Sequence, residues 1–381
     1  MRVRERRAAL IFAAICLACV LTPALYVLRQ RALPAPPPAA APAAAARAVA
    51  GGETGAAQQA TPGPAVPSPV AGLSGAARGT GPADRTDGAR TPSPEKAWRM
   101  LYRHTALGPD YGLLALSSAA GPPEFRRDLP CDRVHYAGGT GVCLTANRRF
   151  FTTYQALIFD DSFRVLHTID LAGAGSRTRV APNGALAAVT VFVSGHSYAD
   201  AKFSTSTTLI ETRSGARVAD LEEFLTLRDG APWKEQDFNF WGVTFAKDSE
   251  AFYATLASGG RTFLVHGSVK ARRMEVVREG VECPSLSPDG AHVAFKKVTD
   301  APYRHWVIAV LDLGTMQETS LKEKRNVDDQ VDWLDDEHII YGLPESETVS
   351  SAVVNTWVVD RRGVDEPKLL LRNAASTVVV R

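Results

Sequence analysis

The feature that most constrains the fold is a strand–turn–strand pattern that recurs along the chain. Its clearest copy covers residues 282–296, where apolar stretches flank the dipeptide Asp289-Gly290. Asp-Gly favours a tight hairpin turn, because such turns need positive φ, which Gly adopts without steric cost and Asp tolerates. Further copies occupy residues 179–189, 243–253 and 331–341, and looser copies occupy residues 108–115 and 134–143.

The spacing of these copies predicts the architecture. Aligned on Ala181, Phe245, Ser287 and Trp333, the four clear copies lie about 64, 42 and 46 residues apart. Repeats of about 40–50 residues with several short strands each are typical of propeller blades. The six hairpins therefore predict an all-β, six-bladed β-propeller over residues 97–381. We expect the last apolar stretch, residues 375–380, to pair with the first blade and close the ring.

The form Ser-Pro-Asp-Gly-x-x-Val-Ala-Phe at residues 287–295 resembles the TolB-like, WD40-like propeller repeat of membrane-anchored bacterial proteins. The resemblance runs from Trp98 to the C-terminus and implies a protein-interaction scaffold at the cell envelope. It does not transfer the partners of the TolB translocation system, because a different segment replaces the small α/β domain before that propeller. Such repeats also precede hydrolase domains in prolyl-oligopeptidase-like peptidases, but no such domain follows here, so we expect no enzyme.

The N-terminal segments differ sharply from the repeats. Residues 1–7 are basic, and residues 8–28 are apolar and uncharged, which is long enough for a membrane-spanning helix. The basic flank predicts a single-pass signal anchor in the cytoplasmic membrane, with the N-terminus inside and the propeller outside. The alternative is a secreted or lipid-anchored protein after signal cleavage. Residues 29–96 are rich in Ala, Pro and Gly and predict a disordered tether.

Three cysteines lie in the repeat region: Cys131, Cys143 and Cys283. If Cys131 and Cys143 continue one hairpin around its turn, they stand about five rows, or about 17 Å, apart, which is too far for a disulfide. We therefore expect three buried free thiols. The alternative, a disulfide, requires a different register.

Composition and motifs argue against several kinds of chemistry. The net charge of +2 and the absence of a basic cluster beyond the first residues predict no nucleic-acid binding. No histidine pair has zinc-ligand spacing, and residues 195–199 are only a weak echo of the hydrolase nucleophile motif. The acidic residues Asp328, Asp329 and Asp332, followed by residues 335–337, could supply oxygen ligands to a cation, or residues 335–336 could simply form a turn. We predict no cofactor and no metal.

Aligning the repeats also places several residues at one rim of the channel. Arg177, Trp241, Cys283 and Asp329 occupy equivalent positions, next to a second ring that includes Phe240. Aromatic and arginine side chains are frequent in binding surfaces. The candidate binding residues are Arg177, Asn239, Trp241, Glu282, Asp328 and Asp329, together with two long stretches of the third blade, residues 194–203 and 225–237. The alternative is that Phe240 and Trp241 pack between blades.

These observations predict a non-enzymatic, membrane-tethered, monomeric propeller outside the cytoplasm that binds an envelope or secreted protein. One alternative is a binding module for a small molecule, glycan or peptide in the channel. The other is a metal-dependent propeller lyase or hydrolase.

Overall fold

The computed structural model describes residues 99–381 except 119–120, 196, 199–202, 300–304 and 347–351. The predicted membrane segment at residues 8–28 and the tether at residues 29–96 lie outside the described residues. Within the described part of the chain, no helix is both long and apolar enough to cross a membrane.

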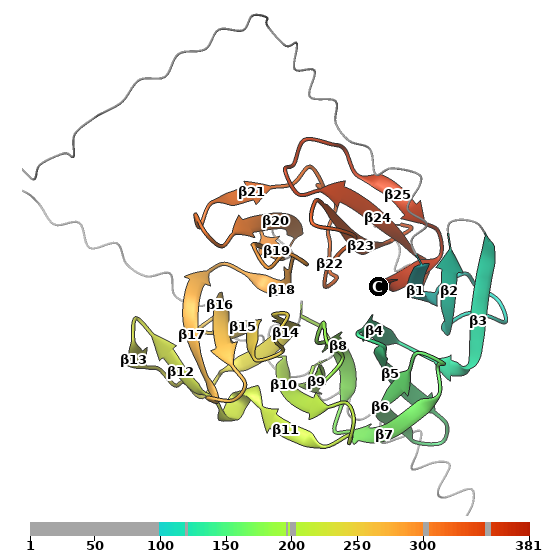
Figure 1. Cartoon of the computed structure of the whole chain (residues 1–381), viewed down its shortest axis with the longest axis horizontal. Helices are drawn as coiled ribbons and strands as arrows, with labels where there is room; N and C mark the ends of the chain where they lie inside the picture. The colour runs from blue at the N-terminus through green and yellow to red at the C-terminus, as the bar shows by residue number, and fades with distance from the viewer. Residues whose placement is uncertain (1–98, 119–120, 196, 199–202, 300–304, 347–351) are drawn as a thin grey trace, which may run out of the picture. The chain divides into compact units, whose positions relative to one another are not determined.

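Six antiparallel sheets stand around a central axis, as blades of a propeller (Figure 1), and the predicted all-β six-bladed fold is confirmed. From the inside outward, blade 1 contains β26 (Ala374–Val380), β1 (Arg99–His104), β2 (Leu113–Ser118) and β3 (Gly121–Pro130). Blade 2 contains β4 (Arg133–Ala137), β5 (Thr140–Arg148), β6 (Thr152–Asp160) and β7 (Val165–Leu171). Blade 3 contains β8 (Ala174–Val180), β9 (Leu186–Ser194), β10 (Ser204–Glu211) and β11 (Arg217–Asp220).

The second half of the ring follows the same order. Blade 4 contains β14 (Asn239–Phe245), β15 (Ala251–Ser258), β16 (Arg261–Ser268) and β17 (Arg273–Glu279). Blade 5 contains β18 (Glu282–Leu286), β19 (His292–Val298), β20 (Trp306–Asp312) and β21 (Glu318–Ser320). Blade 6 contains β22 (Asp332–Trp333), β23 (His338–Pro344), β24 (Val354–Asp360) and β25 (Lys368–Leu371).

The ring is closed by the C-terminal strand, as the sequence predicts. β26 pairs antiparallel with β1, with Leu101 opposite Val378 and Met100 opposite Val379. The inner strand of blade 1 thus comes from the end of the chain. For this reason the looser sequence copy at residues 108–115 falls on the connection from β1 to β2 rather than on an inner hairpin.

The alternating strands give the propeller two different ends. The turns between first and second strands lie at what we call the hairpin end, at residues 138–139, 183–184, 248–249, 289–290 and 335–336. The connections between second and third strands begin and end at the opposite end, the loop end, and their described residues are 105–112, 149–151, 195, 197–198, 203, 259–260, 299, 305, 345–346 and 352–353. At the hairpin end the turn glycines Gly184 and Gly290 have φ of 75° and 79°, as the Asn-Gly and Asp-Gly pairs predict.

An apolar cluster fills each of the six interfaces between neighbouring blades. Between blades 5 and 6, for example, Trp333 and Ile339 pack against Ala294 and Ile308, and all four are at most 1% exposed. Since every blade buries both of its faces in this way, residues 99–380 form a complete ring that needs no other segment to cover its core.

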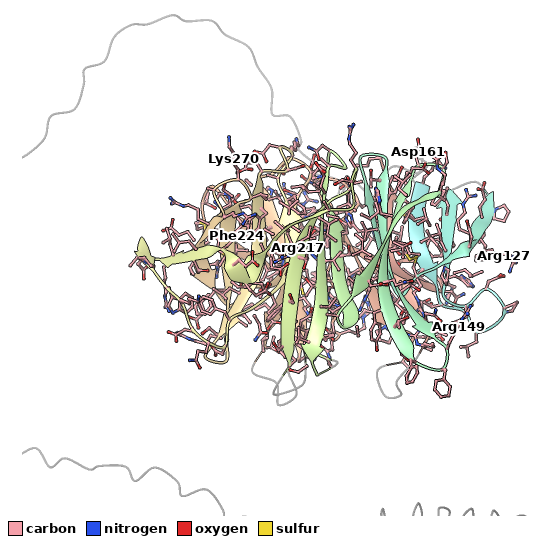
Figure 2. All side chains as sticks on the ribbon, turned by 90° about the horizontal axis from the view of Figure 1, so that it is seen from below. Arg127, Arg149, Asp161, Arg217, Phe224 and Lys270 are labelled. Carbon is pink, nitrogen blue, oxygen red and sulfur yellow. A yellow bond between two sulfur atoms is a disulfide. The ribbon has the colours of Figure 1, made fainter. Side chains whose placement is uncertain are left out.

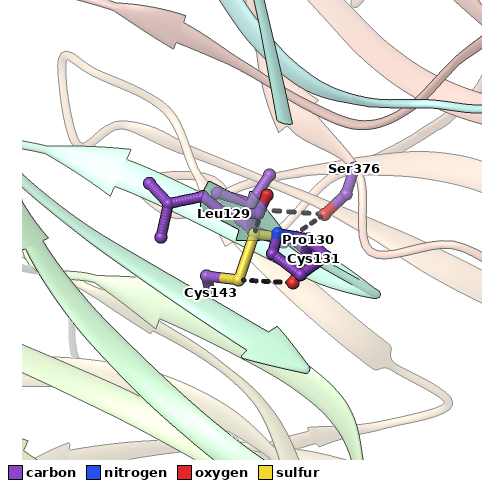
Figure 3. The surroundings of a disulfide bond; sticks show 6 residues. Leu129, Pro130, Cys131, Cys143 and Ser376 are labelled. Carbon is purple, nitrogen blue, oxygen red and sulfur yellow. Dashed lines mark hydrogen bonds between the residues drawn. A yellow bond between two sulfur atoms is a disulfide. The ribbon is translucent and has the colours of Figure 1, made fainter. Parts of the chain in front are cut away.

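The prediction of three free thiols is wrong for two of them. Cys131 and Cys143 form a disulfide with a Cα–Cα distance of 5.4 Å (Figure 3). Cys283 is free and buried. Cys131 precedes β4 and does not continue its ladder, because its backbone N–H donates to the Gly112 carbonyl of blade 1. The next residue, Asp132, donates its N–H to the Leu144 carbonyl, which turns the chain back toward Cys143.

The long stretch after blade 3 is also more ordered than predicted. Residues 225–237 were expected to be a loop, but β12 (Leu225–Arg228) and β13 (Ala231–Pro232) form a hairpin that extends the sheet of blade 4. β12 runs parallel to β17 and covers its outer edge. Covering an edge strand removes unpaired backbone groups that would otherwise attract other chains.

Replacing Cys131 and Cys143 together by Ser should lower the free energy of unfolding by about 2–4 kcal/mol, because the disulfide closes a short loop in the unfolded chain. Guanidinium denaturation of the propeller would measure this change. The matched control is Cys283→Ser, which keeps the disulfide. A reductant should lower the free energy of unfolding of the parent and of this control, but not that of the Cys131/Cys143 double variant. Equal stability of the double variant and the parent would contradict the disulfide.

Candidate functional site

Ion pairs cross the central channel between blades 3 and 6, which face each other in a six-bladed ring. Arg177 and Arg179 of β8 are two residues apart, so both side chains project from the same face of the strand. Arg179 Nη1 lies 3.0 Å from Asp332 Oδ1, and Arg177 Nη2 lies 3.4 Å from Asp328 Oδ1. The two blades are therefore joined across the axis by two pairs of opposite charges.

Two further cations, Arg133 and Lys296, complete this arrangement. Arg133 of blade 2 lies 3.0 Å from Asp329. Lys296 of blade 5 is fully buried, and its Nζ lies 2.7 Å from Asp328 Oδ1 and 4.3 Å from the centre of the Trp306 ring. Buried charges are tolerated where they are paired and hydrogen-bonded, and here each carboxylate has a cationic partner.

The pKa values of the channel carboxylates reflect these partners. Burial alone would raise the pKa of Asp328, but Lys296 and Arg177 outweigh it and hold this pKa far below its usual range. Burial also opposes ionisation of Asp332, and Arg179 in turn holds the pKa of that carboxyl far below its usual range. Both groups are therefore charged throughout the physiological pH range.

His135 lies beside the Arg179–Asp332 pair. Its Nδ1 accepts a hydrogen bond from the Val180 N–H at 3.0 Å, and its Nε2 lies 2.9 Å from Arg179 Nη1 and 3.4 Å from Asp332 Oδ2. Burial, and then the charge of Arg179, lower the pKa of His135, so the imidazole is neutral at neutral pH. Because both ring nitrogens contact neighbouring groups of the protein, His135 is poorly placed to act as a general base or metal ligand.

A cavity of about 600 Å³ opens at the hairpin end of the channel. His135, Arg179 and Asp332 line both this cavity and a space of about 30 Å³ further along the channel, so they form the floor of the cavity. A space of about 30 Å³ holds on the order of one water molecule. The ion pairs thus close the channel and leave a cavity that is accessible from one end.

The cavity walls come from the inner hairpins of five blades, blades 2 to 6, and from the ring-closing strand. Apolar surface is contributed by Phe245, Tyr253, Leu286, Trp333 and Val378. The chain ends beside the cavity, at Arg381, and Figure 1 shows this end near the centre of the ring. The arrangement combines an apolar wall with a charged floor and a polar mouth, which is typical of ligand-binding pockets.

Four charged side chains stand at the mouth, and they are not equivalent. Asp248 accepts hydrogen bonds from the N–H groups of the two residues that follow its turn, and Asp289 accepts from Ser287 Oγ and from a turn N–H. Within the described residues, neither Lys247 nor Arg381 has a carboxylate side chain at ion-pair distance; Arg381 donates to backbone carbonyls of blade 6. The mouth therefore offers two cationic groups to a ligand.

The structure places the predicted binding residues in the wall and the ion pairs of the channel. Arg177, Asp328 and Asp329 belong to the ion pairs described above. Trp241 is 1% exposed and packs with Phe192 and Trp306, which agrees with the alternative that it belongs to the core.

The other two predicted binding residues are held by neighbours. Glu282 is buried, and its Oε2 accepts a hydrogen bond from Trp306 Nε1 at 3.1 Å. Asn239 Oδ1 accepts a hydrogen bond from the Thr205 N–H at 2.8 Å. That this rim binds a partner stays a prediction. In the described residues its side chains are buried, ion-paired or hydrogen-bonded to neighbours.

The acidic run that could have held a cation is distributed over separate contacts. Asp335 pairs with His338, and Glu337 pairs with Arg361, while the channel aspartates face Arg and Lys. Among the residues that the structure describes, no group of three or more His, Cys, Asp or Glu side chains is placed to hold a metal ion. The arrangement of the described carboxylates favours charge pairing over cation binding.

The hairpin-end cavity was not predicted from the sequence, although the sequence contains a signal for it. The residues directly before the turns, Pro182, Lys247 and Pro288, occupy equivalent positions in three repeats, and all three line the cavity. Their spacing predicts the turns but not the width of the space between them, which depends on how the blades are inclined.

Replacing Arg179 by Met should lower the free energy of unfolding by about 3–5 kcal/mol, because it leaves the buried Asp332 carboxylate without its main partner. Adding Asp332→Asn should recover part of this loss. Denaturation of the parent, both single variants and the double variant measures the coupling energy. Additive losses would contradict a direct interaction.

The contribution of Asp332 to the free energy of unfolding should also depend on pH. The folded pKa of Asp332 lies below its unfolded value, so its stabilising contribution is complete above about pH 4–5 and is lost as the pH falls toward the folded pKa. The stability difference between the parent and Asp332→Asn should therefore shrink on acidification.

No sequence-family model matches the chain, and no curated protein matches it by sequence. Its fold is similar to solved structures. TolB from Acinetobacter baumannii matches with a TM-score of 0.52 and 13% identity, over 74% of this chain and 66% of that one. A putative TolB from Agrobacterium tumefaciens matches with a TM-score of 0.41 and 10% identity, over 74% and 97% of the two chains. The chain thus has a six-bladed β-propeller fold similar to that of TolB-like propellers.

Proposed function

We propose that this protein is a non-enzymatic propeller that binds a segment of a partner protein in the hairpin-end cavity and serves as an interaction scaffold at the cell envelope. The observation that carries the proposal is the cavity itself, with a volume of about 600 Å³ and a floor closed by ion pairs. Sites of about 300–1,000 Å³ bury small ligands or a few side chains.

The chemistry of the cavity suggests what the segment contains. The exposed parts of Tyr253 and Leu286 in the wall favour an apolar side chain on the partner. Lys247 and Arg381 at the mouth favour a carboxylate beside it. An extended stretch of a few residues with one apolar and one acidic side chain matches both requirements.

The cavity lining argues for binding rather than catalysis. Both ring nitrogens of His135 contact groups of the protein, Nδ1 the Val180 N–H and Nε2 the Arg179 guanidinium, and Arg179 and Asp332 neutralise each other. The Ser287 hydroxyl donates to Asp289 and accepts from the His292 N–H, so it stabilises its own turn. These groups maintain the fold, and none of them forms a nucleophile paired with a positioned base.

The membrane tether is part of the proposal. Residues 8–28 would anchor the chain in the cytoplasmic membrane, and residues 29–96 would separate the propeller from it on the outer side. The Cys131–Cys143 disulfide supports this location, because disulfides persist mainly in oxidising compartments outside the cytoplasm.

A small molecule or glycan is the second candidate ligand, because the cavity volume also matches compact ligands. The two candidates share one site, so the same variants test both. A ligand-dependent rise in melting temperature without a captured protein would favour the compact ligand.

The test is crosslinking in cells of the full-length protein, followed by capture and mass spectrometry. Lys247→Glu/Arg381→Glu reverses both charges at the mouth and should reduce the captured partner by about tenfold or more. The matched control, Lys234→Glu/Lys270→Glu, makes the same charge change at exposed positions away from the cavity and should capture the partner normally. Normal capture by the mouth variant would refute binding at this cavity.

A further inference from the structure

The loop end of the propeller carries exposed aromatic side chains that no described residue covers. Phe150 and Phe151 lie at the tip of the β5–β6 hairpin and are 92% and 76% exposed. Their ring centres are 4.8 Å apart, so they form one apolar tip. Figure 2 shows the neighbouring Arg149 near one edge of the propeller, with Asp161 and Lys270 near the opposite, hairpin edge.

Other blades add apolar side chains to the same end. Leu107 of blade 1, Val193 of blade 3 and Val298 of blade 5 are 77%, 61% and 40% exposed. All three lie in, or next to, connections between second and third strands, which the alternating strand directions bring to the loop end. Single exposed apolar residues are common on protein surfaces, so the two adjacent phenylalanines are the main feature of this end, and the side chains of the other blades add to it.

Arginines accompany the aromatic tip. Arg148 and Arg149 directly precede Phe150. Arg148 lies 3.1 Å from Asp132, whereas Arg149 has no carboxylate at ion-pair distance within the described residues. Aromatic rings next to arginines are typical of segments at the boundary between lipid headgroups and acyl chains.

We propose that the loop end docks on the surface of a phospholipid bilayer, with Phe150 and Phe151 inserted into its interfacial region. The apolar groups occupy separate loop tips, and a fluid bilayer can contact all of them without a complementary shape. An anionic headgroup would pair with Arg149. In this orientation the hairpin-end cavity faces away from the bilayer and stays accessible to a partner.

This inference rests on the proposed function, because the proposed tether would strengthen the binding of the loop end to the bilayer. Two inserted phenylalanines bind a bilayer weakly on their own, but a tether raises their effective concentration at its surface. Residues 29–96 span 68 residues (96 − 29 + 1), for which a flexible chain has an end-to-end distance of about 45 Å. β1 starts at the hairpin end, so the proposed docking requires the tether to reach that end from a bilayer at the loop end, and this length would permit it.

The test is co-sedimentation of the propeller, residues 97–381, with vesicles of phosphatidylcholine alone or mixed with an equal part of phosphatidylglycerol. Because this fragment lacks residues 8–28, any binding to vesicles comes from the propeller and not from the proposed membrane anchor. Phe150→Ser/Phe151→Ser should lower the partition coefficient about tenfold or more. The matched control is Val165→Ser/Leu166→Ser, which removes two partly exposed apolar side chains at the hairpin end. This control should leave the partition coefficient unchanged.

Two further results decide the proposal. Arg149→Ser should weaken binding to the anionic vesicles only, and the cavity variant Lys247→Glu/Arg381→Glu should bind vesicles like the parent. Absence of parent binding at saturating lipid, or an equal loss in the Val165/Leu166 control, would overturn the docking proposal and leave partner binding in the cavity unaffected. Loss of the captured partner in the Phe150/Phe151 variant would identify the face as a protein interface instead.

Discussion

The Arg179–Asp332 ion pair is the interaction on which the functional architecture depends. It joins blades 3 and 6 across the axis, and the pair formed by Arg177 and Asp328 repeats the connection one layer further along. Apolar clusters hold each blade to its neighbours, but they do not determine the structure of the central channel. The paired charges determine it, because buried charges are stable only next to their partners. They turn an open channel into a cavity with a floor.

A closed channel makes the two ends of the propeller functionally different. The hairpin end has short turns around a cavity with apolar walls and two available cations. The loop end has longer connections with exposed phenylalanines and no ion-paired partner for Arg149 among the described residues. The inner turns are short, and two of them have the fixed geometry of Asn-Gly and Asp-Gly, so they suit a precise pocket. The outer connections have no such constraint and can carry residues that serve contacts outside the protein.

The sequence predicts the elements whose cause is local. Asp289-Gly290 predicts its turn, and the unpartnered stretch at residues 375–380 predicts ring closure, because both depend on a few adjacent residues or on pairing rules. Sequence reasoning was wrong about Cys131 because a hydrogen bond to blade 1 turns the chain before β4. It also missed β12, whose parallel partner β17 lies far along the chain. The repeat alignment placed Arg177 and Asp329 at equivalent positions, and both line the smaller space in the channel, but the alignment could not show that each would meet an opposite charge from another blade.

The most direct test of the account places a photocrosslinking amino acid at one position at a time in the full-length protein in cells. At Tyr253, in the cavity wall, it should form an adduct with a partner protein. At Asn239, in the predicted rim at the other end of the channel, it should form none, and at Phe150 it should label lipid. A protein adduct at Asn239 together with none at Tyr253 would contradict the claim that the ion pairs leave the hairpin-end cavity as the binding site.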